Sequence, residues 1–173
     1  MRSTRGFSLI ELLIVVAIIL VIAAIAIPSL LQAKISANEA SAVGSLRAMT
    51  SAEAAYYTAY PSVGYATSIT QLGGATPCTP TSATSCLIDN YLATSTTGSG
   101  GKSGYFFQAT GVITGGASAF DAYVIGTAPI TMFRTGNHDY CSANDGVLRS
   151  QIGTAGDTPV TVLATCLAYP VAQ

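Results

Sequence analysis

The chain has 173 residues, of which 50% are hydrophobic and only 9% charged, whereas soluble globular domains carry about 25% charged residues. The formal net charge is −1 with only seven Lys and Arg residues, which argues against a concentrated basic face, so no nucleic-acid partner is expected. His138 is the single histidine, which excludes any site that needs two. The length fits one domain, or one domain with an appendage.

An apolar run covers residues 7–31, where Glu11 is the single charged residue. A membrane-spanning helix needs about 20 apolar residues, so this run is long enough to cross a bilayer. Arg2 and Arg5 precede it, and no cation follows until Lys34. The positive-inside rule therefore predicts a cytoplasmic N-terminus and an exported remainder.

Two ordinary interpretations of this run are a secretory signal peptide cleaved near residues 24–26 and a plain single-span anchor. Glu11 fits neither of them, because an ionised carboxylate within hydrocarbon costs ~2.5–3.5 kcal/mol. No basic residue lies within two helical turns of Glu11 on the same helix. We therefore expect its partner to be a lipid headgroup, a freed amino terminus or another subunit.

The start of the run resembles the type IV prepilin and pseudopilin family in six consecutive residues, Gly6-Phe7-Ser8-Leu9-Ile10-Glu11. The resemblance implies that residues 1–6 are a class III leader. It implies that a prepilin peptidase cleaves between Gly6 and Phe7 and N-methylates the new Phe7 amine. It also implies that Glu11 directs assembly, with an inner-membrane assembly platform and a separate assembly ATPase as further partners.

A pair between Glu11 and the amine of a neighbouring Phe7 would favour one axial register between subunits, because polar groups in helical seams set register. Pro28 lies inside the same helix. Proline removes one backbone hydrogen bond and clashes with the preceding turn, which predicts a helix break, as a kink or as local melting over residues 24–28. Filaments of the resembling family often loosen their helix in this region.

The helix is expected to continue to residue 60, because apolar residues keep a helical spacing and Pro61 follows. One face carries Leu31, Ile35, Ala42, Leu46, Met49, Tyr56 and Tyr60. Four charged residues are expected mostly off this face: Lys34, Glu39, Arg47 and Glu53. Residues 7–60 thus form one long N-terminal helix, with residues 7–31 as its transmembrane and assembly part.

Residues 61–173 are expected to form a globular head. Residues 61–103 are predicted to form a loop with helical turns at 69–72 and 87–92. Residues 160–168 are predicted to form a fifth strand or a return loop. Two hairpins are predicted around turn signals, from residues 105–110 with 119–125 and from 140–142 with 147–149. The predicted fold class is α+β, a long N-terminal α-helix packed on a small antiparallel β-sheet of three to five strands, as in type IV pilins.

All four cysteines lie in the exported part: Cys78, Cys86, Cys141 and Cys166. An even number of cysteines in an oxidising compartment favours disulfides, and three connectivities are open. The simplest pairs Cys78 with Cys86 and Cys141 with Cys166, and the second bridge resembles the C-terminal disulfide loop of many pilins. A zinc site ranks lower, because close Cys spacing and a second histidine are missing.

Three further motifs give weaker indications of function. Residues 98–103 end like a phosphate-binding loop, but Thr96 stands where its first glycine is needed and a predicted strand follows. Calcium, which major pseudopilins commonly bind near the end of the chain, would need carboxylate or amide oxygens, and the candidates are Asp139, Asn144, Asp145 and Asp157. EF-hand spacing is absent and hairpin turns explain two of them, so no metal ligand is assigned. No Ser-His-acid arrangement stands out, and no enzymatic activity is expected.

These observations favour a structural subunit of a type IV pilus-like filament, made as a single-pass precursor in the bacterial inner membrane and polymerised through its helix into an extracellular pilus. The alternative is a major-type pseudopilin of a type II secretion system, in a periplasmic pseudopilus. Residues 122–136 and 145–149 resemble the sheet region of such pseudopilins more loosely. A membrane-anchored binding module that never polymerises is a third hypothesis. A minor pilin that binds DNA is the fourth, and the few basic residues argue against it.

Overall fold

The structure is a computed structural model that describes residues 6–172. The chain divides into two compact units, Met1–Lys34 and Ile35–Gln173. Helix α1 (Leu9–Ala59) has 51 residues and contributes to both units. Its length confirms the long N-terminal helix. It ends before Pro61, which disfavours helical geometry in the residue that precedes it. Arg2 and Arg5, on which the predicted orientation rests, lie outside the described residues.

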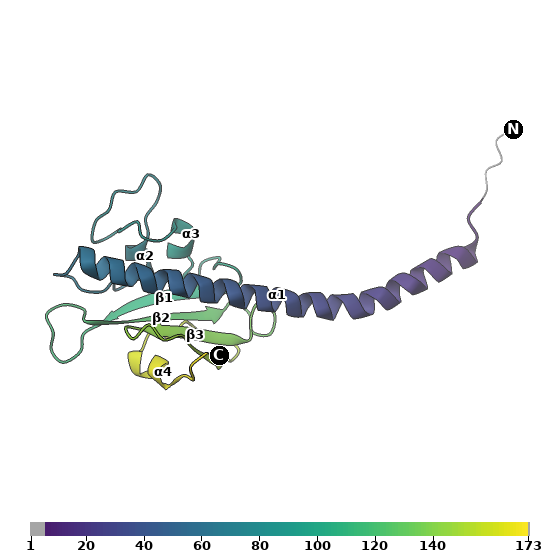
Figure 1. Cartoon of the computed structure of the whole chain (residues 1–173). Coiled ribbons are helices and arrows are strands. Elements are labelled where there is room, and N and C mark those ends of the chain that lie inside the picture. Colours follow the sequence, from purple (N-terminus) through teal and green to yellow (C-terminus); the bar gives the residue numbers. More distant parts are fainter. Residues whose placement is uncertain (1–5, 173) are drawn as a thin grey trace. The chain divides into compact units, whose positions relative to one another are not determined.

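The second unit contains one antiparallel sheet in the order β1-β2-β3-β4. Its strands are β1 (Tyr105–Val112), β2 (Ala122–Pro129), β3 (His138–Ala143) and β4 (Arg149–Ile152). Neighbouring strands pair in chain order, with Tyr105 opposite Pro129 and Cys141 opposite Arg149. The sheet and the long helix together confirm the predicted α+β fold class (Figure 1).

Three local predictions need correction. Residues 160–168 contain helix α4 (Leu163–Ala168), not a strand. The second hairpin is shifted, because β4 begins at Arg149 and the two residues before it lie outside any strand. Helix α2 (Ile69–Leu72) matches a predicted turn, whereas helix α3 (Asn90–Ala93) begins three residues later than the second one. The side chain of Asp89 caps α3 by accepting the Leu92 N–H, which explains that start.

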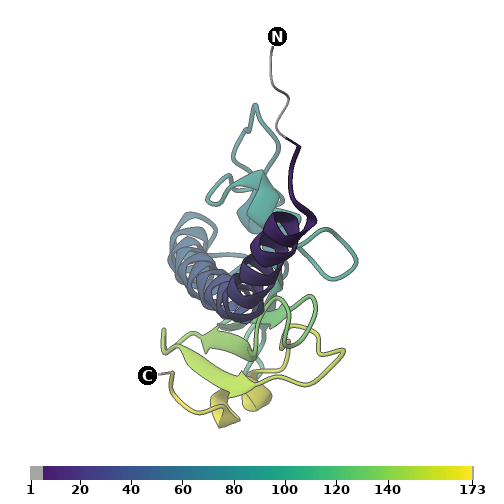
Figure 2. The ribbon, with the colours of Figure 1, turned by 90° about the vertical axis from the view of Figure 1, so that its right-hand side faces the viewer.

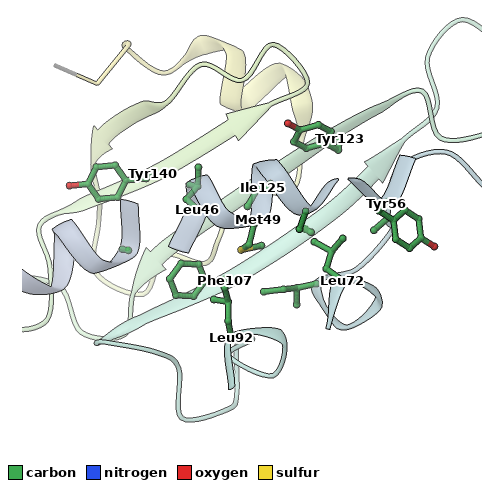
Figure 3. Packing of buried hydrophobic residues seen from close by; sticks show 14 of the residues in the cluster. Leu46, Met49, Tyr56, Leu72, Leu92, Phe107, Tyr123, Ile125 and Tyr140 are labelled. Atoms are coloured by element: carbon green, nitrogen blue, oxygen red, sulfur yellow. The ribbon is translucent and has the colours of Figure 1, made fainter. Parts of the chain in front are cut away.

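The sheet buries side chains on both faces. Within the second unit it lies between residues 35–59 of α1 and helix α4, and the end-on view shows the same layers (Figures 1 and 2). The larger core joins α1 to one face of the sheet. Leu46 and Met49 from the helix meet Phe107 and Ile125 from β1 and β2 (Figure 3). Because both faces are covered, every residue of β2 is buried.

A smaller core lies on the other face and contains Val124, Cys141, Cys166 and Tyr169. The segment before α4 crosses β2 so closely that a Cβ at Gly126 would collide with the backbone of Val160. Glycine is therefore required at this crossing, since any larger residue would push the segment off the sheet. The chain then returns along β4, where Ser150 N–H donates to the Pro170 carbonyl at 2.9 Å.

The predicted apolar face of α1 is buried in the second unit at Ile35, Ala42, Leu46, Met49 and Tyr56. The expectation that Glu53 lies away from this face is wrong, because Glu53 has 0% exposure. Its carboxylate lies against the segment that follows α1, where it accepts the buried Ala66 N–H at 2.9 Å. That hydrogen bond satisfies a buried backbone donor, which accounts for an acidic residue on an apolar face.

Candidate assembly segment and polar sites of the head

Glu11 lies in the first turn of α1 and has a partner within its own chain. The Ser8 N–H donates to the Glu11 carboxylate at 3.3 Å. Because α1 begins at Leu9, Ser8 is the N-cap and Glu11 the third helical residue, and this bond is one half of a capping box. Sequence reasoning missed this contact, although the spacing Ser8-x-x-Glu11 signals it. In the single chain Glu11 thus stabilises the start of its helix.

The segment from residue 6 to residue 31 buries none of its large apolar side chains. Phe7, next to the predicted cleavage site after Gly6, has an exposed fraction of 75%. About 20 apolar residues in a helix are enough to span the hydrocarbon of a bilayer. Among the described residues, α1 is the one helix long and apolar enough to cross a membrane. An apolar surface of this extent needs lipid or other helices around it.

Pro28 lies inside α1, which continues as helix on both sides of it. Local melting over residues 24–28 is absent from the described single chain. A break at Pro28 in an assembled filament, where neighbouring helices surround this region, stays a prediction.

The four cysteines form two bridges in the structure. Cys78 bonds to Cys86 across a sequence separation of 8, and Cys141 bonds to Cys166 across 25. Cys141 and Cys166 both have 0% exposure and belong to the smaller core. The second bridge therefore fixes α4 on the sheet, and the first closes the loop that follows α2.

The acidic residues considered for calcium lie in two places, with Asp139 beside Asp157 and Asp145 apart from them. Asp139 has 2% exposure, and its Oδ1 has no hydrogen-bond partner in the described chain. Burial, together with the neighbouring Asp157, raises the pKa of Asp139 to about 7. Asp145, beyond the other end of β3, pairs with Arg149 and accepts the Val147 N–H. No group of three or more His, Cys, Asp or Glu side chains placed to hold a metal ion occurs among residues 6–172. The expectation that the protein needs no cofactor stays a prediction.

Two further polar contacts tie loops of the head together. Glu39 on α1 accepts the Asn137 N–H at 2.8 Å and lies 3.1 Å from His138 Nδ1. The lone histidine thus contacts a carboxylate on α1. Lys102, the lysine of the phosphate-loop-like motif, lies 3.8 Å from Asp89, and strand β1 follows the motif. The helix that a phosphate-binding loop must precede is therefore missing at this position.

Comparisons with known proteins agree with the N-terminal motif. Residues 1–27 match the family described as the prokaryotic N-terminal methylation motif. The chain is 59% identical over 39 residues to the type IV wide pilus major component PilA4 of Thermus thermophilus. That match covers 22% of this chain and 30% of the relative. No solved structure matches the chain.

Three features fit a type IV pilin-like chain: the leader motif, the apolar start of α1 and the packing of a helix on a sheet. The N-terminal segment of the chain therefore carries the prokaryotic N-terminal methylation motif and is similar to a type IV pilus major component.

Proposed function

We propose that the protein is a structural, non-catalytic subunit of a type IV pilus-like filament. A prepilin peptidase cleaves the precursor between Gly6 and Phe7 and methylates the Phe7 amine. The observation that carries the proposal is the apolar helix start, whose large side chains are exposed in the single chain, with one acid four residues after Phe7. The likeness to a pilus major component supports it.

The proposal assigns two successive surroundings to residues 7–31. In the precursor they span the inner membrane, with the head exported. In the filament they pack against the same residues of sister subunits, because an all-round apolar helix must be buried. The inner-membrane assembly platform and a separate ATPase transfer the subunit from the first surroundings to the second.

Glu11 then exchanges partners. In the single chain it accepts the Ser8 N–H. In the filament it accepts from the methylated Phe7 amine of a neighbour, a cation that the leader peptide keeps from forming before cleavage. Removing one partner of a buried ion pair typically costs ~3–5 kcal/mol, enough to disfavour other registers.

The test is mass spectrometry of the N-terminus of the native protein. The expected mature chain begins at N-methylated Phe7. A chain that begins at Met1, or just beyond Ala26, would contradict the proposal and favour the anchor or the secretory interpretation.

The alternative within the same family is a major-type pseudopilin of a type II secretion system, suggested by the looser likeness of residues 122–136. Electron microscopy of sheared surface material separates the two. Long extracellular fibres composed of this chain support the pilin. Loss of secretion on deletion, in cells whose surface fibres are unchanged, supports the pseudopilin.

A further inference from the structure

The loop that joins β2 to β3, residues 130–136, presents an exposed apolar residue pair and an exposed cation. Phe133 has an exposed fraction of 63% and Ile130 of 38%, and Arg134 is exposed beside them. Among the described residues of the second unit, Phe133 is the one phenylalanine exposed to this degree. A phenyl ring has no polar group that could hydrogen-bond with water.

The backbone of this loop holds Phe133 outward. Phe133 has a φ of 61°, in the left-handed region that bulky residues rarely adopt. Hydrogen bonds within the loop enforce that conformation. Phe133 N–H donates to the Gly136 carbonyl at 2.9 Å, and Thr135 N–H donates to the Thr131 carbonyl at 2.9 Å. The exposed ring is thus built into the fold, and such enforced strain is typical of functional positions.

The same loop is tied to α1. The Asn38 side-chain amide donates to the Thr135 carbonyl at 2.9 Å. Asn38 follows Leu31, the last residue of the apolar run, by seven residues. Seven residues span about 10 Å as helix and at most about 25 Å when extended. Only a short stretch of chain and one hydrogen bond thus connect Thr135 to the end of the apolar run.

The charge of the loop suits an anionic surface. No carboxylate within residues 6–172 forms a salt bridge with Arg134. The other exposed side chains of the loop's outer part, Ile130, Thr131 and Phe133, are uncharged. An aromatic ring next to an unpaired cation is the combination that enters the headgroup region of a bilayer, with the cation beside lipid phosphates.

We propose that residues 130–134 contact the exported face of the inner membrane, with the Phe133 ring inserted among the lipid headgroups and Arg134 paired with anionic phospholipid. The contact exists before assembly and breaks when the subunit leaves the membrane. This inference rests on the proposed membrane-anchored precursor.

The absence of tryptophan from the chain allows a direct test. Single-tryptophan variants of the full chain are reconstituted into vesicles of phosphatidylcholine and phosphatidylglycerol that contain brominated lipids. Bromine quenches only tryptophan that reaches its depth. Phe133→Trp tests the loop, and Leu20→Trp in the apolar run reports insertion of the anchor independently. Ile113→Trp is the control, since Ile113 is 49% exposed just beyond the opposite end of β1.

The expected result is quenching of Leu20→Trp by deep bromines, quenching of Phe133→Trp by shallow bromines, and no quenching of Ile113→Trp. Adding Arg134→Gln should weaken the partition of the Phe133→Trp loop about fivefold in vesicles with phosphatidylglycerol. It should have no effect in vesicles of phosphatidylcholine alone. If Phe133→Trp shifts the unfolding midpoint, Ile130→Trp gives the same measurement from the same loop.

Quenching of Leu20→Trp without quenching of Phe133→Trp overturns this inference and leaves the proposed function intact. Unquenched Leu20→Trp contradicts the membrane-anchored precursor itself, and the inference falls with it. Equal quenching of Ile113→Trp and Phe133→Trp overturns the specific contact. A blue shift of Phe133→Trp in assembled fibres, with no change in vesicles, also overturns it and assigns the loop to a contact between subunits.

Discussion

The carboxylate of Glu53 accepts the Ala66 N–H at 2.9 Å, and both residues have 0% exposure. The second carboxyl oxygen, Oε1, has no hydrogen-bond partner in the described chain. Burial raises the pKa of Glu53 to about 8, against the lowering effect of the Ala66 hydrogen bond. Glu53 is therefore neutral in the folded head at pH 7, although the same group is ionised in the unfolded chain.

The stability of the head should depend on pH through Glu53. Between its unfolded pKa of 4.5 and its folded pKa of about 8, the folded state binds more protons than the unfolded state. The contribution of Glu53 to the free energy of unfolding is therefore largest below pH 4.5. It decreases as the pH rises and is lost above pH 8. We expect a total decrease of about 1–4 kcal/mol. Urea unfolding of the detergent-solubilised chain from pH 4 to pH 9 measures it.

Glu53→Gln is the matched control, because the amide oxygen can still accept the Ala66 N–H and does not titrate. Asp139, whose pKa is also raised, to about 7, contributes a slope of the same sign in both proteins. The difference between the two pH profiles therefore isolates Glu53. Parallel profiles would show that Glu53 is ionised in the folded head and would contradict its assignment as a neutral residue.

Helical periodicity could not reveal the burial of Glu53. It predicted the buried positions from Ile35 to Tyr56 because those side chains are apolar and recur at helical spacing. Glu53 was excluded by its charge alone. The reason for its burial is the Ala66 N–H, thirteen residues further along the chain. A contact of that kind follows from how the chain turns after α1, and local patterns do not contain it.

The sheet was more predictable than its surroundings. Turn residues located both hairpins, since Gly115-Gly116 and Asp145-Gly146 are strong signals between apolar segments. Helix α4 was missed because six residues are too few to distinguish a helical period from a strand. At the N-terminus, the motif at Gly6, Phe7 and Glu11 was readable, but the capping bond to Ser8 was overlooked.

The two disulfides should contribute unequally to stability. Loop-closure entropy predicts ~3–4 kcal/mol for the Cys141–Cys166 bridge and ~2–3 kcal/mol for the Cys78–Cys86 bridge, since the first closes the longer loop. Replacing Cys141 and Cys166 by serine also puts two hydroxyls into a buried core. Denaturant unfolding of the two double-serine variants measures the difference. Equal midpoints would count against α4 being held to the sheet by its bridge.

Two glycine-to-alanine substitutions should have opposite effects. Gly126→Ala places a Cβ against the Val160 backbone, so it should displace residues 160–168 and destabilise the head by about 1–3 kcal/mol. Gly44→Ala meets no atom within 4 Å and removes a glycine from a helix interior, which should stabilise α1 by about 0.5–1 kcal/mol. Thermal unfolding compares the pair, and hydrogen exchange of residues 160–168 locates the first effect. Unchanged exchange in Gly126→Ala would refute the close crossing.

The central claim is that Glu11 joins sister subunits, and the most direct measurement is filament yield from cells that express Glu11→Ala. Glu11→Gln serves as a second variant, because its amide can still accept the Ser8 N–H but carries no charge for a neighbouring amine. We expect both variants to insert in the membrane and to be cleaved after Gly6. We also expect both variants to give at least tenfold fewer fibres. Losing about 1.4 kcal/mol at each contact between subunits already weakens that contact tenfold. Normal fibre yield from Glu11→Gln would contradict the account, because the charge of Glu11 would then play no part in assembly.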